Sequence, residues 1–136
     1  MEHNMDIDKV IQEGMTREEN FQVTEEHTAI HVGSGGSQVL ATPWMIAFME
    51  RVAHRLLVEN LPAGESSVGV LVEVRHLAPT PVGKTVRMQV EIVKLDGTQV
   101  TFFVQAWDQA EKIGEGRHQR VVINEARFLR RVEGKK

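Results

Sequence analysis

The feature that most constrains this chain is one long amphipathic helix, predicted over Ala41–Val58. Pro43 suits the first turn of a helix, where its missing N–H costs no hydrogen bond, and the hydroxyl of Thr42 can cap that turn. At about 100° per residue one arc is apolar, while Arg51 and Arg55 point away from it. The arc consists of Met45, Ile46, Met49, Val52, Ala53, Leu56 and Leu57. The helix is therefore predicted to lie on an apolar surface.

Glu50 lies on the shoulder of this arc, between Ile46 and Leu57. A carboxylate covered by apolar groups needs a partner, or its pKa rises. Glu50 is therefore a candidate functional residue. The alternative is a surface pair with His54, four residues further along the helix.

After a turn at Leu61–Ser66 the pattern changes to a period of two residues, which is typical of strands. One face of the next strand is expected to carry Val68, Val70, Val72, Val74, His76 and Ala78. Pro79 and Pro81 end this strand because proline cannot supply ladder N–H groups. His76 continues an apolar face, so a buried structural histidine and a catalytic one both remain open.

Two further strands are predicted at 86–92 and 100–106, where apolar residues alternate with polar ones. We expect a three-residue loop between them, with Gly97 left-handed in a G1 bulge and Ile92 opposite Val100. A last strand is predicted over 112–123. Its glycine-rich face allows close approach of another backbone or a ligand. That face consists of Gly114, Gly116, His118, Arg120 and Val122.

The sequence before the helix gives weaker signals. Residues 1–15 are predicted to form an N-terminal arm, and a strand with a polar interruption is predicted from Phe21 to Val32. His27 and His31 are four residues apart, a spacing that suits metal binding only on a helix, so no metal site is expected. Gly33–Ser37 is predicted to be a mobile connection, since no Gly-Lys-Ser/Thr follows to complete a phosphate-binding loop.

Composition excludes several classes of function. A length of 136 residues fits a single domain, and the net charge of −3 is mixed along the chain, so no nucleic-acid partner is expected. The absence of cysteine removes thiol nucleophiles and thiolate zinc sites, and it fits a reducing compartment. No apolar run reaches the ~20 residues of a membrane span, and no signal peptide is evident. We therefore expect a cytoplasmic protein without membrane association.

One helix followed by four strands predicts an α+β domain in which a curved antiparallel sheet wraps around the helix, the hot-dog architecture. The domain is expected to span 1–136, with the arm at 1–15 and a basic C-terminal tail at 124–136. Because such a sheet leaves free edges, we expect a homodimer or a higher homo-oligomer.

Three segments carry a resemblance to a known family: ATPWMIAFME, GESSVGVLVEVRHLAPTPVG and EKIGEGRHQRVVI. Together they resemble the fluoroacetyl-CoA thioesterase family of hot-dog proteins, from Ala41 to about Val132. The resemblance implies a catalytic set of Thr42, Glu50 and His76. It further implies that Gly69 and Arg120 lie beside the substrate.

The implied reaction is hydrolysis of a short acyl-CoA thioester, with no cofactor beyond the coenzyme A of the substrate. Glu50 would be nucleophile or general base, His76 a general acid or base, and the hydroxyl of Thr42 a hydrogen-bond donor. The family's loop before the helix is rich in phenylalanine, but no aromatic residue stands between Phe21 and Trp44. Fluoroacetyl-CoA specificity is therefore not expected.

The coenzyme A phosphates need basic partners, and the tail supplies five candidates, although a solvated tail is the simpler interpretation. These are Arg127, Arg130, Arg131, Lys135 and Lys136. Two other functions stay open at this point. One is a non-catalytic module that binds acyl-CoA or another small molecule, and the other is a hot-dog hydratase or dehydratase.

Overall fold

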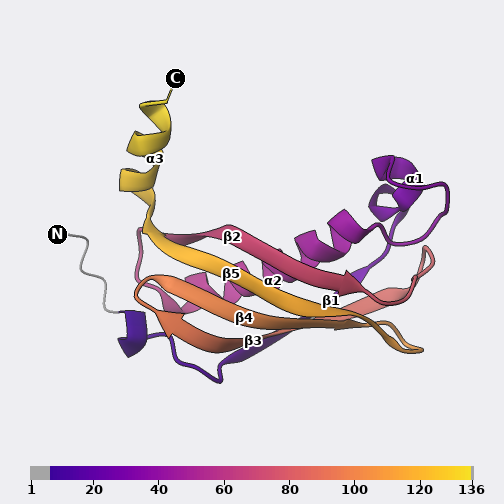
Figure 1. The fold of residues 1–136 in the computed structure, drawn as a ribbon, viewed down its shortest axis with the longest axis horizontal. Helices are drawn as coiled ribbons and strands as arrows, with labels where there is room; N and C mark the ends of the chain where they lie inside the picture. The colour runs from indigo at the N-terminus through magenta and orange to yellow at the C-terminus, as the bar shows by residue number, and fades with distance from the viewer. Residues whose placement is uncertain (1–6, 136) are drawn as a thin grey trace.

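The computed structural model describes residues 7–135, and its strands form one antiparallel sheet in the order β1-β3-β4-β5-β2. The long helix α2 lies along one face of this curved sheet (Figure 1). The predicted α+β hot-dog arrangement is confirmed. The elements are η1 (Ile7–Lys9), β1 (Thr16–Gln22), η2 (Glu25–His27), α1 (Ala29–Val32), α2 (Thr42–Asn60), β2 (Glu65–His76), β3 (Thr85–Asp96), β4 (Gln99–Trp107), β5 (Lys112–Asn124) and α3 (Glu125–Glu133).

The core lies between α2 and the sheet. The helix buries Met45, Phe48, Met49, Val52, Ala53, Leu56 and Leu57. Phe48 belongs to this buried face and the predicted Ile46 does not. The ring of Phe48 stacks on the ring of Phe21 in β1, with centroids 4.4 Å apart. Within residues 7–135, no helix combines the length and the apolar character needed to cross a membrane.

The segment before α2 is helical where a strand was predicted. Thr28 accepts a hydrogen bond from the backbone N–H of His31 at 3.2 Å and so caps α1, and Gly33 ends this helix with a φ of 86°. The predicted strand at 29–32 is therefore wrong, because the local capping bonds outweigh the β-branched composition. His27 packs edge-on against Trp44, with ring centroids 4.5 Å apart.

The N-terminal arm is docked on the body in its described part. Ile7 and Ile11 are 4% and 0% exposed, so they belong to the core. The backbone N–H of Gly14 donates to the carbonyl of Ile92 at 2.8 Å. Residues 1–6 of the predicted arm lie outside the described residues.

The β3–β4 hairpin differs from the predicted register. Asp96 pairs with Gln99, which leaves a two-residue turn, and Ile92 pairs with Phe102 instead of Val100. Gly97 is left-handed as expected, with a φ of 62°. The extra residue is Val93, which bulges within β3, so the predicted bulge at the turn is wrong.

β2 contains a bulge that changes which of its residues face α2. Gly69 pairs with Arg120 and Leu71 with Gln119, so Val70 is the extra residue. The predicted continuous face from Val68 to Ala78 is therefore wrong before the bulge, because a single inserted residue inverts the alternation. Gly69 and His76, seven residues apart, consequently lie on the same face of the sheet.

The glycine-rich face of β5 permits close packing of neighbouring groups. A Cβ added at Gly116 would lie 2.1 Å from the carbonyl oxygen of Glu73, and one added at Gly114 would lie 2.5 Å from Sδ of Met45. The prediction that these glycines allow close approach of another backbone is confirmed.

Substituting Gly116→Ala tests this packing. Because the obstructing atoms are backbone atoms of β2, we expect the free energy of unfolding to fall by about 1–3 kcal/mol, measured by urea denaturation. Gly36→Ala is the matched control, since a Cβ there meets nothing within 4 Å. Equal stability of the two variants would show that β2 and β5 are not held this closely.

Candidate active site

A connected cluster of polar side chains surrounds Arg120, which β5 directs toward α2. The residue is only 7% exposed, so its charge and N–H donors need partners. Its Nε donates to Oγ of Ser67 at 2.8 Å, and its Nη2 donates to the carbonyl of Ser67 at 3.2 Å. Its Nη1 lies 3.1 Å from Nε2 of His118 and 3.5 Å from Oε2 of Glu50. Burial lowers the pKa of Arg120, and the nearby Glu50 carboxylate opposes this.

The Glu50 carboxylate lies over Gly69, between α2 and β2. A Cβ added at Gly69 would lie 2.5 Å from Oε2 of Glu50 and 3.3 Å from Nη1 of Arg120. A side chain at this position would therefore displace the ion pair. The Glu50 side chain is still 42% exposed, so the carboxylate is accessible to a ligand.

The alternative pairing of Glu50 with His54 is not what the structure shows. Nδ1 of His54 lies 2.8 Å from Oγ of Ser67, so this ring faces β2. The carboxylate of Glu50 instead faces Arg120 and lies 3.9 Å from Nε2 of His118.

His118 belongs to this group although the sequence analysis gave it no role. It is 1% exposed, and its Nδ1 lies 2.8 Å from the carbonyl oxygen of Leu71. A carbonyl only accepts, so Nδ1 carries the proton and Nε2 accepts from Arg120. Burial is the main cause that lowers the pKa of His118. The available signal was its position on the glycine-rich face of β5, two residues from Arg120.

Thr42 and His76 form a second pair, at the start of α2 and the end of β2. Oγ1 of Thr42 lies 2.7 Å from Nδ1 of His76. The predicted helix cap is wrong, because the N-cap is Ala41 and no side chain caps this helix. Burial lowers the pKa of His76, which the backbone at Ala78 opposes through a hydrogen bond.

This second pair opens into a pocket of about 340 Å³ beside α1. Its walls come from the segment before α2 and from the end of β2. The lining residues are Ala29, Ser34, Val39, Leu40, Ala41, Thr42, His76, Leu77, Ala78 and Pro79. A small acyl group or part of a pantetheine arm fits a space of this size.

Within one chain the two groups are separate. Thr42 and Glu50 are eight residues apart on α2, which corresponds to about 12 Å along the helix axis. The structure therefore brings Glu50, Gly69 and Arg120 together in one place, and Thr42 with His76 in another.

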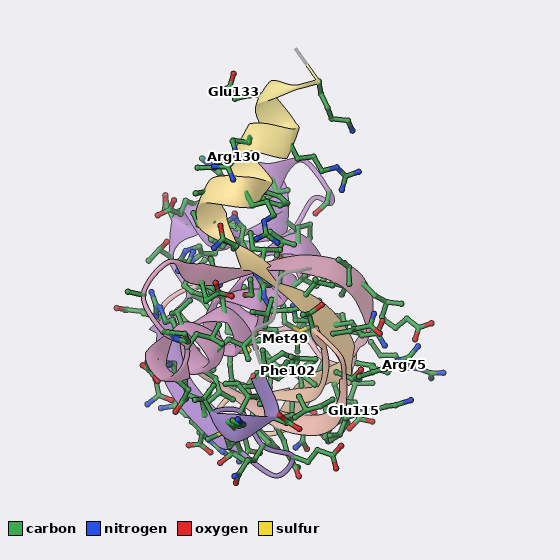
Figure 2. The ribbon with its side chains drawn as sticks, turned by 90° about the vertical axis from the view of Figure 1, so that its left-hand side faces the viewer. Met49, Arg75, Phe102, Glu115, Arg130 and Glu133 are labelled. Carbon is green, nitrogen blue, oxygen red and sulfur yellow. The ribbon has the colours of Figure 1, made fainter. Side chains whose placement is uncertain are left out.

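Within the basic tail, Glu125–Glu133 form the helix α3, which was not predicted from the sequence, and Lys136 lies outside the described residues. Arg130 and Glu133 lie on this helix where it projects from the body, whereas Met49 and Phe102 lie in the interior (Figure 2). Arg127 and Arg131 line a pocket of about 370 Å³ at the base of α3.

Comparison with known proteins identifies the family. The fluoroacetyl-CoA-specific thioesterase family matches residues 23–126, which is most of the chain. The chain belongs to the fluoroacetyl-CoA thioesterase family. A fluoroacetyl-CoA thioesterase of Streptantibioticus cattleyicolor is 36% identical over 98 residues, which are 72% of this chain and 70% of that protein.

Solved structures agree with this assignment. A structure of a fluoroacetyl-CoA thioesterase is 30% identical and superimposes with a TM-score of 0.87, covering 93% of this chain and 98% of that one. A hot-dog-like protein from Thermanaerovibrio acidaminovorans is 27% identical with a TM-score of 0.89, covering 96% and 97%. A thioesterase superfamily member from Thermus thermophilus is 31% identical with a TM-score of 0.82, covering 92% and 95%.

Membership of the fluoroacetyl-CoA thioesterase family makes this chain a thioester hydrolase that acts on acyl-CoA thioesters. Of the three functions that the sequence left open, the family assignment supports the hydrolase.

One buried histidine and two partly buried ones predict a pH dependence of stability. Burial lowers the pKa values of His54, His76 and His118 below the ordinary value of 6.5. The unfolded chain therefore binds more protons near this pH than the folded chain does, and the free energy of unfolding should fall as the pH drops below about 6.5.

Urea denaturation between pH 7.5 and about 5 measures this slope. His118→Asn should give a shallower slope, because it can keep a donor toward Leu71 but does not titrate. His31→Asn, at an exposed position on α1, is the matched control and should keep the wild-type slope. An unchanged slope in His118→Asn would contradict the account of a histidine buried in its neutral form.

Proposed function

We propose that this thioesterase hydrolyses short acyl-CoA thioesters with Glu50 as its reactive carboxylate. The observation that supports this proposal is the accessible Glu50 carboxylate beside the buried guanidinium of Arg120, over a glycine that leaves room for both. A charged donor at this place can stabilise the negative charge that develops on a thioester carbonyl during attack.

Two routes use the same residues and the same atoms. Glu50 either takes a proton from a water molecule that attacks the carbonyl carbon, or attacks that carbon itself to form an anhydride that water then opens. In both routes one C–O bond forms to oxygen from water and the C–S bond breaks. The departing sulfur takes a proton, for which His76, with the hydroxyl of Thr42, is the proposed source. The proton that the water loses to Glu50 passes to solvent and an equivalent proton returns to His76, so that both groups are restored.

Completing this set requires a second chain, so we place the site in a homodimer. β2 is an edge strand, and Val70 and Val72 on it are 53% and 39% exposed, which favours pairing with another copy. Antiparallel pairing of two β2 strands about a two-fold axis at Glu73, with Val70 again the extra residue, would set Gly69 opposite His76 of the partner subunit. The Glu50 group of one subunit would then face the Thr42–His76 pair of the other.

The proposed substrates are acetyl- and propionyl-sized acyl groups without selection for fluorine. The segment that walls the pocket beside Thr42 contributes Ala29 and Ser34, and no aromatic residue stands between Phe21 and Trp44. An apolar pocket distinguishes small groups by only about 1–3 kcal/mol per methylene, so such a wall supports weak discrimination.

The coenzyme A moiety is part of the substrate, and we propose that no other cofactor takes part, because carboxylate, imidazole and guanidinium groups suffice for the steps above. Contact between the coenzyme A phosphates and the arginines of α3 stays a prediction, for which the position of Arg127 and Arg131 at one pocket is the support.

The absence of cysteine from the sequence supports a reducing cytoplasm as the compartment of this protein.

Glu50→Gln tests the assignment of the reactive carboxylate. An amide keeps the shape and a hydrogen-bonding oxygen for Arg120 but is neither base nor nucleophile, so we expect kcat for acetyl-CoA to fall by about 10²–10⁴-fold. Glu59→Gln, on the same helix and paired with Arg17, is the matched control. Activity of the Glu50 variant within about threefold of the wild type, in a folded protein, would refute the assignment.

Mixing two inactive variants tests the composite site. After subunit exchange between Glu50→Gln and His76→Ala proteins, half of the dimers are mixed and each has one intact site of two, so about a quarter of wild-type activity should return. A site contained within one chain predicts no recovery at any mixing ratio. Analytical ultracentrifugation of the same samples shows whether dimers are present.

A further inference from the structure

Ser67 accepts hydrogen bonds from the Arg120 guanidinium, and His54 in turn contacts Ser67. Neither Ser67 nor His54 has a role in the proposed reaction. Ser67 is 6% exposed and contacts the guanidinium through two atoms, its hydroxyl oxygen and its carbonyl oxygen. The hydroxyl oxygen also lies 2.8 Å from Nδ1 of His54. A chain of hydrogen bonds therefore runs from α2 through β2 to β5.

The direction of the Arg120 bonds follows from the chemistry of the guanidinium. Arg120 can only donate, so the hydroxyl oxygen of Ser67 accepts from its Nε. The single proton of that hydroxyl is then available to donate to Nδ1 of His54. In the arrangement inferred below, Nδ1 is unprotonated and accepts it, so that His54 is the neutral tautomer with its proton on Nε2.

The contacts made by Ser67 fix the plane of the guanidinium. Nε and Nη2 are both bound to this one residue, so rotation about the end of the Arg120 side chain would break two hydrogen bonds at once. Nη1 is left directed at His118, Glu50 and the space over Gly69.

We propose that His54 and Ser67 are a positioning pair for Arg120: they hold its Nη1 toward the reacting carbonyl while touching neither substrate nor Glu50 themselves. Rotamer freedom of a long side chain is lost before the substrate arrives, so the donor needs no reorganisation during attack. The inference rests on the proposed function for its kinetic consequence, but its hydrogen-bond geometry can be measured without any substrate.

The tautomer of His54 is the first test. In ¹⁵N-labelled protein at neutral pH, long-range ¹H–¹⁵N NMR spectra should show His54 with its proton on Nε2 and a bare Nδ1. The His54→Asn spectrum assigns the signals. A proton on Nδ1 would overturn the inference, because Ser67 would then not be donating to the ring.

Kinetics of Ser67 variants form the second test. Ser67→Ala leaves the buried Nε–H of Arg120 without its acceptor, and we expect kcat for acetyl-CoA to fall by about 10–100-fold while KM changes by less than about threefold. Ser67→Thr keeps the hydroxyl and should restore kcat to within about threefold of the wild type. A purely structural role would instead change stability and both constants alike.

Three variants, Ser66→Ala, His54→Asn and His54→Leu, complete the kinetic comparison. Ser66→Ala, at the neighbouring position on the opposite face of β2, should leave kcat unchanged. His54→Asn keeps an acceptor near the position of Nδ1, so it should retain more activity than His54→Leu. An active enzyme in which Ser67→Ala and Ser66→Ala behave alike would overturn the positioning role. If the wild-type protein releases no thiol, the proposed function fails, and the NMR result still decides whether the hydrogen-bonded pair exists.

Discussion

The buried positive charge of Arg120 is the constraint on which the polar interior of this protein depends. A guanidinium between sheet and helix is stable only if its donors are satisfied and a negative charge is near. Ser67 and His118 supply neutral acceptors, and Glu50 supplies the carboxylate at 3.5 Å. Gly69 supplies the empty space that lets carboxylate and guanidinium meet. Because the donors of Arg120 must be paired for the arrangement to be stable, its guanidinium is held in one orientation beside the accessible Glu50 carboxylate.

The bulge at Val70 connects this arrangement to the rest of the fold. An uninterrupted strand would place residues seven apart on opposite faces, so either Gly69 or His76 would point away from α2. The inserted residue turns both toward the helix, where Gly69 meets Glu50 and His76 meets Thr42. The bulge in β2 thus turns Gly69 and His76, and with them the Glu50 group and the Thr42–His76 pair, toward the same face of the sheet. Within one chain about 12 Å of helix still separates the two groups. The proposed two-fold pairing of β2 closes that gap.

The sequence predicted the elements whose apolar residues follow a regular period. It did not predict the features that depend on contacts between residues distant in the chain. Helical period located α2, and alternation located β2 to β5, because each signal comes from neighbouring residues. The contact of Thr42 with His76 could not be found this way, since the two residues are 34 positions apart in the chain. The bulge at Val70 was hidden because valines continue at every second position through it. The only signal for His118 was its position on the glycine-rich face, two residues from Arg120, and the folded sheet shows that its ring contacts the guanidinium.

The central claim is that this protein cleaves short acyl-CoA thioesters without selecting for fluorine. The most direct measurement is the release of free coenzyme A thiol from acetyl-, propionyl- and fluoroacetyl-CoA, with kcat/KM of each compared with its rate of hydrolysis by hydroxide. The account predicts many turnovers on all three substrates, and a fluoroacetyl-to-acetyl ratio that exceeds the hydroxide ratio by no more than about 200-fold. Binding of acyl-CoA without release of thiol would contradict hydrolysis, and a fluoroacetyl preference thousands of times above the hydroxide ratio would contradict the proposed substrate range.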